Sequence, residues 1–171
     1  MSVASITDTK QYLTFRLGEE IFALDVSHVR EILECNTVTK VPKTPEYMTG
    51  VINLRGSVVP VLDMRLKFGL SKTEKTVDTC IIVVEVFFED ESAIIGALVD
   101  SVQEVFELEP DRIEPAPRIG TLLRTEFIKG MAKRDDRFII LLDTDKVFSS
   151  DELVVTLETE GEESLEKAGN E

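Results

Sequence analysis

The chain is poor in the side chains that most metal sites and nucleophilic enzymes require. Its 171 residues include one histidine, two cysteines and no tryptophan. Zinc sites recruit several histidines or cysteines, and a catalytic triad needs a histidine as its base. The one histidine, His28, lies in a short turn, where we expect it to be exposed and without a catalytic role. The sequence therefore predicts no metal site and no catalytic residue.

Glycine-rich phosphate loops are also missing, because the nine glycines are spread singly along the chain. Such loops bind nucleotides, so we expect no cofactor of that kind and infer none of any other. Carboxylates are in excess, and among 33 aspartates and glutamates some pairs must lie close together. Two carboxylates can serve as acid and base, so a carboxylate-pair enzyme stays open as the alternative from another functional class. No pair stands out, and we expect the chain not to be an enzyme.

Basic residues and long apolar runs are scarce as well. The 19 lysines and arginines give a net charge of −14, which argues against a nucleic-acid partner and against docking on an anionic membrane. The longest apolar runs, Ile81–Val84 and Phe138–Leu142, are far too short for membrane insertion. Since the N-terminus has no secretion signal and two cysteines make no disulfide framework, we expect a cytoplasmic location.

The charge is distributed unevenly, because half of it lies in the last 21 residues, which hold eight acidic residues and one lysine. We expect residues 156–171 to be a disordered acidic tail that aids solubility. Residues 1–10 are expected to be a flexible N-terminus, which leaves residues 11–155 as the folded domain. A polar, lysine-containing segment divides this domain into two predicted subdomains, about 11–70 and 77–148.

Valine, isoleucine and threonine make up 47 of the 171 residues, a bias that favours strands. Residues 26–33 are expected to form a helical turn that leads into a strand. Further short helices are expected at Pro45–Met48, at Met64–Phe68 behind an Asp63 cap, and behind Asp143. Apolar runs bounded by turn residues predict strands at 11–18, 21–25, 50–54, 58–62, 79–88, 93–99, 127–133 and 137–142.

An internal repeat is the most informative feature. Residues 50–68 align without gaps with residues 130–148, and a glycine, a leucine, an aspartate and a phenylalanine coincide. Residues 21–33 likewise align with residues 94–106, and both copies contain the pattern V-x-x-V-x-E. Each half is marginal for a core of its own, and five short strands have exposed edges unless they close into a barrel. The residues therefore predict an all-β protein of two five-stranded barrels, with short helices and a binding groove between the barrels.

At this point the sequence resembles the CheW-type chemotaxis coupling proteins. The resemblance extends over residues 11–155 and is most specific in GVINLRGSVVPVLD at 50–63, with FALDVSHVREI at 22–32 before it. It implies two intertwined five-stranded barrels of the SH3-like kind. It also implies a non-enzymatic adaptor that couples the cytoplasmic tips of methyl-accepting chemoreceptors to the regulatory domain of the histidine kinase CheA. A CheW-like scaffold of a non-flagellar chemosensory pathway is an alternative that the sequence does not separate.

Carried over by position, the resemblance implies that the receptor tip lies in the groove between the barrels. Val29 and Glu31 would line one side, and Arg55 would face the receptor helices from a hairpin turn that Gly56 permits. Each has a simpler interpretation: Val29 as core packing, Glu31 as a solvated strand residue and Arg55 as an exposed turn residue. The kinase-binding residues stay unknown, and the loop at Pro42–Met48 is only a weak candidate.

Overall fold

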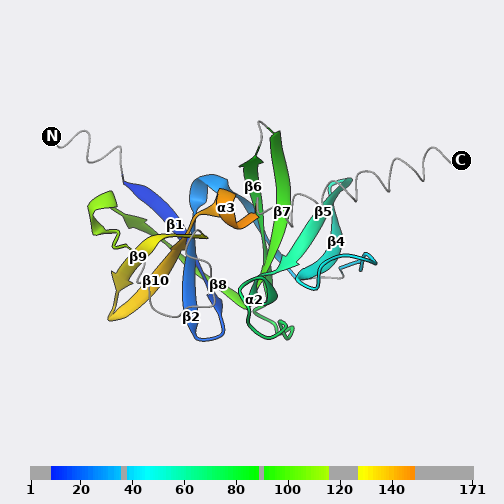
Figure 1. Ribbon diagram of the computed structural model, residues 1–171, viewed down its shortest axis with the longest axis horizontal. Helices are drawn as coiled ribbons and strands as arrows, with labels where there is room; N and C mark the ends of the chain where they lie inside the picture. The colour runs from blue at the N-terminus through cyan, green and yellow to red at the C-terminus, as the bar shows by residue number, and fades with distance from the viewer. Residues whose placement is uncertain (1–8, 36–37, 89–90, 116–126, 149–171) are drawn as a thin grey trace, which may run out of the picture.

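The computed structural model describes residues 9–35, 38–88, 91–115 and 127–148, and these form strands joined by short turns and helices (Figure 1). The strands are β1 (Lys10–Leu17), β2 (Glu20–Asp25), β3 (Val29–Glu34), β4 (Met48–Leu54), β5 (Ser57–Asp63), β6 (Cys80–Phe88), β7 (Glu91–Val99), β8 (Ser101–Leu108), β9 (Ile128–Arg134) and β10 (Arg137–Leu142). The short helical elements are η1 (Val26–His28), α2 (Met64–Lys67), η2 (Pro110–Arg112) and α3 (Thr144–Phe148).

The strands form two five-stranded sheets, which lie side by side in Figure 1. The first barrel has the strand order β8-β1-β2-β10-β9, and the second barrel has the order β3-β6-β7-β5-β4. Neighbouring strands are antiparallel except for β10 with β2 and β5 with β7, which are parallel. The predicted all-β fold with two five-stranded units is therefore confirmed.

The barrels do not coincide with the predicted subdomains 11–70 and 77–148, and those boundaries need correction. Each barrel combines the first two strands of one half with the last three strands of the other. The chain crosses from one barrel to the other after β2, through η1, and again after β7, at Asp100. Apolar patterning predicts which residues form strands, but a strand's partner depends on contacts with the distant half of the chain.

The internal repeat is confirmed in three dimensions, because β4, β5 and α2 occupy the same places in the second barrel as β9, β10 and α3 in the first. Asp63 caps α2 by accepting hydrogen bonds from the amides of Arg65 and Leu66. Asp143 accepts one from the amide of Lys146 at 3.3 Å in the same way at α3. The two predicted aspartate caps are thus correct, since a carboxylate satisfies amides that the first helical turn leaves unpaired.

Two smaller expectations are wrong. Residues 45–48 form a single turn, in which the amide of Met48 donates to the carbonyl of Pro45 at 2.9 Å, because β4 already begins at Met48. The repeat also predicts a helical turn at the second crossing, but the structure has only a bend at Asp100 before β8 begins. The expectations for residues 1–8 and for the acidic tail at 156–171 lie outside the described residues.

The largest apolar cluster lies between the two barrels rather than inside either one. It joins Phe15 and Phe22 of the first barrel to Ile82 and Ile95 of the second, all of them buried. Smaller clusters fill the interior of the first barrel, around Tyr12 and Leu141, and of the second, around Val61 and Val83. The cluster shared by the barrels holds more buried residues than the two barrel interiors together, which suits a fold in which each half alone is marginal for a core.

Candidate functional site

The hairpin between β4 and β5 presents Arg55 and Gly56 at its tip. Leu54 pairs with Ser57, so the loop has two residues, and both have positive φ, 52° for Arg55 and 88° for Gly56. The Gly56 amide donates to Oδ1 of Asn53 at 2.8 Å. A Cβ atom on Gly56 would meet nothing within 4 Å. The backbone angle, and not lack of space, is therefore the reason for glycine at this turn.

Glu31, on β3, forms a two-point ion pair with Arg55. Arg55 Nη1 lies 2.7 Å from Glu31 Oε2, and Nη2 lies 3.2 Å from Oε1. The Arg55 side chain is 75% exposed, whereas the Glu31 side chain is 24% exposed. The planar guanidinium matches a carboxylate in this geometry, and so the arginine is held upright at the tip while most of its surface stays in water.

A β-bulge at the start of β3 turns Val29 and Glu31 in different directions. Val29 pairs with Val84 of β6, and Glu31 pairs with the very next residue, Val83, which leaves Arg30 as the extra residue. Val29 packs against the cluster between the barrels, as Val84 does. Glu31 lies beside Val83, which belongs to the cluster inside the second barrel. A bulge next to a site commonly re-aims a side chain in this way.

The Glu31–Arg55 pair borders a cavity of about 600 Å³ at the mouth of the second barrel. The cavity lies where β5 and β7 are not yet paired, since their parallel ladder begins at Val61 and Gly96. Pro60, which precedes Val61, has no amide hydrogen to give to a ladder. The lining residues are Arg30, Glu31, Leu54, Arg55, Ser57, Val58, Val59, Val83 and Ile94.

The structure brings together three of the four predicted receptor-binding residues: Glu31, Arg55 and Gly56. Val29 is separate from them and packs in the core, as its simpler interpretation holds. The apolar surface between the barrels is occupied by the largest core cluster, and the cavity beside Arg55 belongs to the second barrel alone. Sequence reasoning missed Val58, which is 73% exposed. Val58 is the second residue after the two-residue turn, and an apolar residue so close to a turn was the available signal.

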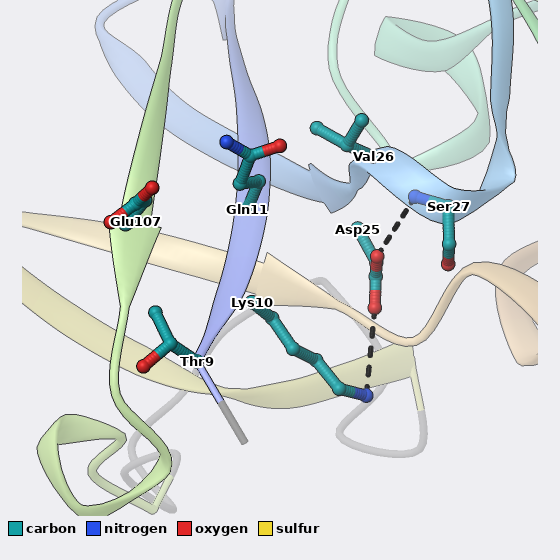
Figure 2. Close-up of a pocket in the computed structure, with 7 residues that line it drawn as sticks. All are labelled: Thr9, Lys10, Gln11, Asp25, Val26, Ser27 and Glu107. Atoms are coloured by element: carbon teal, nitrogen blue, oxygen red, sulfur yellow. Dashed lines mark hydrogen bonds and ion pairs between the residues drawn. The ribbon is translucent and has the colours of Figure 1, made fainter. Parts of the chain in front are cut away.

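A second cavity, of about 730 Å³, lies at the start of β1 and is shown in Figure 2. Asp25 is central to it, accepting a hydrogen bond from the Ser27 amide at 2.9 Å and lying 3.6 Å from the ammonium of Lys10. Burial alone would raise the pKa of Asp25, but the bonds from Ser27 and the charges of Lys10 and Lys129 hold it below its ordinary value. Asp25 therefore stays ionised and caps η1 at the first crossing.

Neither cavity has the arrangement that a carboxylate-pair enzyme would use. The cavity beside Arg55 is lined by one carboxylate, that of Glu31, which is engaged in the ion pair. The other is lined by Asp25 and Glu107, and the Asp25 carboxylate is engaged by the Ser27 amide and by the ammonium of Lys10. Within the described ranges, no cluster of three or more histidine, cysteine or acidic side chains is placed to hold a metal ion, and no helix is long and apolar enough to cross a membrane. What the mouth of the second barrel offers is a hollow with a mixed polar and apolar lining. It is bordered by the exposed guanidiniums of Arg30 and Arg55 and by the exposed side chain of Val58, which suits recognition of another protein.

Comparison with known proteins decides the family. A model of the CheW-like domain matches residues 11–152. The chain belongs to the CheW-like family. This CheW-like protein is 36% identical to the chemotaxis protein CheW of Klebsiella aerogenes over 90% of both chains. It is 31% identical to the chemotaxis protein CheW of Thermotoga maritima, over 80% of this chain and 86% of that one.

A solved structure agrees with the fold of this CheW-like protein. The crystal structure of the scaffolding protein TtCheW from Thermoanaerobacter tengcongensis matches with a TM-score of 0.73 and 38% identity, covering 84% of this chain and 90% of that chain. The resemblance seen in the sequence motifs is therefore confirmed. The family is one of chemotaxis scaffold proteins, and the hollow beside Arg55, with the exposed Val58 at its edge, is consistent with a scaffold that binds other proteins.

Proposed function

We propose that this CheW-like protein is a non-enzymatic adaptor that couples chemoreceptors to the histidine kinase CheA. One observation supports this most directly: the Glu31–Arg55 pair stands at the rim of a cavity with a mixed polar and apolar lining, on the motif that links the chain to chemotaxis scaffold proteins. On this proposal, the protein works in the cytoplasm, beside receptor arrays of the membrane.

The chemistry of the rim fits a helical hairpin, which is the form of a chemoreceptor tip. Val58 and Ile94 offer apolar contact, and an amphipathic helix binds by placing its apolar face in such a hollow. Arg55 can then exchange part of its bond with Glu31 for a carboxylate or a C-terminal carbonyl of the helix. Because Arg55 is three-quarters exposed, this exchange needs no rearrangement of the backbone.

The kinase is proposed to bind elsewhere, barrel against barrel, through its CheW-like regulatory domain. The kinase-binding residues are not assigned. The loop at Pro42–Met48 stays the weak candidate that the sequence offered. It lies just before β4, and its Thr44 hydroxyl is tied to the carbonyl of Val41 at 3.0 Å, which is consistent with a mainly structural role.

The experiment is a reconstitution with cognate partners. Purified protein is mixed with membranes containing chemoreceptors and with CheA, and both co-sedimentation and CheA autophosphorylation are measured. We expect the protein to sediment with receptor and kinase together and to raise kinase activity. If neither effect is found with cognate partners, the proposal is wrong. A sedimenting complex with a different set of receptors would instead identify the pathway that this protein serves.

A further inference from the structure

The start of β3 needs an external support, because the bulge at Arg30 interrupts its pairing with β6 immediately before Glu31. A bulged residue has no partner in the ladder, so the register there is weakly fixed by the backbone alone. The residues that direct Glu31 toward Arg55 therefore include any side chain that holds the bulge in place. The contacts made by η1 and α3 show which side chains these are.

Glu85 of β6 receives two bonds from the chain around the bulge. Nδ1 of His28 lies 3.1 Å from the carbonyl oxygen of Glu85. Since a carbonyl only accepts, this contact selects the tautomer with its proton on Nδ1. On the other side of Val29, Nη2 of Arg30 donates to Oε1 of Glu85 at 2.6 Å. The two residues on either side of Val29 are thus anchored to one residue of β6.

Asp145 of α3 completes this support. β6 continues beyond Val84, where its pairing with β3 ends, and the backbone groups on that edge need other partners. The amide of Phe87 donates to Oδ1 of Asp145 at 3.1 Å, and the same Oδ1 lies 3.8 Å from Nδ1 of His28. The side chain of His28 is only 20% exposed, in contrast to the exposed turn residue that the sequence predicts. His28 and Asp145 therefore cover the edge of β6 where β3 stops.

The second crossing has a similar support with the roles exchanged, since its aspartate lies on the crossing and the partner on the helix, which argues that the first support is a built feature. There Asp100 accepts a hydrogen bond from the amide of Gly18 at 2.7 Å. Arg65 of α2 holds this carboxylate at two points, through Nε at 2.7 Å and Nη2 at 2.6 Å. At each crossing, a helix of one half of the chain thus fixes the backbone edge of a hairpin through an aspartate. At the first crossing the partner of the aspartate is the histidine next to the candidate site.

We propose that His28 and Asp145 are positioning residues for partner binding at the Glu31–Arg55 site. His28 holds the chain beside the bulge of β3 against β6 through its hydrogen bond to Glu85, and Asp145 fixes the adjoining edge of β6 through the Phe87 amide and lies against His28. The bulge in turn directs Glu31 toward Arg55. The inference rests on the proposed function in one respect, namely that this site binds the chemoreceptor tip. Neither residue touches the cavity, so their effect on binding must pass through β3.

The test compares alanine with asparagine at both positions. His28→Asn keeps a donor close to the place of Nδ1, and Asp145→Asn keeps an oxygen acceptor for the Phe87 amide, whereas His28→Ala and Asp145→Ala remove these groups. Affinity for a soluble fragment of a chemoreceptor tip is measured by calorimetry. We expect each alanine variant to bind about fivefold more weakly and each asparagine variant to stay within about twofold of the unchanged protein. Lys146→Ala, beside Asp145 on the exposed face of α3, is the matched control and should bind normally.

A second measurement needs no partner. In ¹H–¹⁵N spectra of the free protein, we expect the alanine variants to displace the amide signals of Arg30 and Glu31 and to leave the tip of the other hairpin, at Arg134, unchanged. Alanine variants that bind normally, or asparagine variants as weak as the alanine ones, would overturn the proposal. If the unchanged protein does not bind the fragment, the proposed function is wrong, and the amide signals alone decide whether His28 and Asp145 position Glu31.

Discussion

The two hairpins that the repeat makes equivalent, β4–β5 and β9–β10, are alike at their bases and different at their tips. At the bases, Gly50 and Gly130 each lie against a passing backbone segment, where Thr39 and Glu114 form matching isolated bridges with Val51 and Met131. These contacts recur in both barrels because the fold requires them. The tips face solvent and are free to differ, and only one of them carries the candidate site.

The difference at the tips concerns how an arginine is held. In the second barrel, Arg55 grips Glu31 at two points and projects into water. In the first barrel, Glu104 holds the position equivalent to Glu31, and its partner Arg134 lies 3.4 Å away with its guanidinium over the ring of Phe106, 4.9 Å from the centroid. A guanidinium that stacks on a ring of its own barrel is less available for contact with another protein. Two copies of one plan thus yield one tip suited to recognition.

The largest expected effect tests the backbone contacts that recur at the bases of both hairpins. Gly50→Ala would place a methyl group against the carbonyl of Thr39, a backbone group that cannot move without breaking its bridge to Val51. We expect a loss of about 3 kcal/mol in the free energy of unfolding by urea. Gly130→Ala would meet the side chain of Ile113 first and the carbonyl of Glu114 less closely, and the backbone angle at Gly130, unlike that at Gly50, lies outside the range that strains alanine. It should cost about half as much, and equal losses would contradict this account of the two bases.

The next largest expected effect tests the contacts of Asp100 at the second crossing between the barrels. Burial would raise the pKa of Asp100, but the hydrogen bonds from Arg65 and Gly18 and the charge of Arg65 together lower it. A carboxyl with a lowered pKa in the folded state stabilises the protein above its ordinary range, and this contribution is lost as the pH falls through the folded pKa. Asp100→Asn should therefore cost about 2 kcal/mol at pH 7.

The matched measurement is urea unfolding of the unchanged protein and of Asp100→Asn between pH 7 and pH 3. The difference in unfolding free energy should shrink as the pH falls below the ordinary aspartate value of about 3.9. A difference that stays constant over this range would show that the charge of Asp100 is not what stabilises the crossing. Asp111→Asn, at an exposed residue of η2, serves as the control and should leave the unfolding free energy unchanged at pH 7 and at pH 3.

The sequence predicted most elements of both halves because the signals for them are local, whereas apolar runs did not mark β8. Apolar runs located the strands, and an aspartate before a short apolar segment located each cap, at Asp63 and at Asp143. Pairing between the halves has no such signal. The hydroxyl of Thr14 donates a hydrogen bond to the carbonyl of Glu104, 90 residues away. Neither segment has a sequence pattern that predicts this partner. The residues alone therefore did not predict which strands the barrels exchange. The family resemblance implied that the barrels are intertwined, and the structure shows the pairing.

The candidate site was predictable only in part, for a related reason. Arg55 and Gly56 stand at a recognisable turn, and the resemblance to a known family drew attention to Glu31. The resemblance implied that Val29 and Glu31 line one side of the groove, whereas the structure separates them by the bulge at Arg30, which leaves no trace in the alternation of β3. Support from His28 was missed because a lone histidine in a turn is most simply interpreted as exposed.

A binding measurement sharpens the comparison of the tips. Arg55→Ala should weaken binding of the chemoreceptor tip fragment about tenfold, or about 1.4 kcal/mol, and leave affinity for the CheA regulatory domain within twofold. Stability should change by less than about 1 kcal/mol, because the ion pair is largely exposed. Arg134→Ala, at the other hairpin, should leave receptor binding unchanged. Equal losses toward receptor and kinase would instead indicate misfolding or a different site.

The smallest expected effect tests whether the receptor recognises the backbone of the turn or the side chain of Arg55. Asp136 has a φ of 64° and holds the position that Gly56 holds in the other hairpin. Because a left-handed backbone angle strains any residue with a Cβ atom, Asp136→Gly should stabilise the fold by about 0.5 kcal/mol, seen as a higher urea midpoint. It should not create receptor affinity at the first barrel, since the turn alone brings no free guanidinium. If Asp136→Gly did gain such affinity, the backbone of the tip, and not Arg55, would be the feature that the receptor recognises.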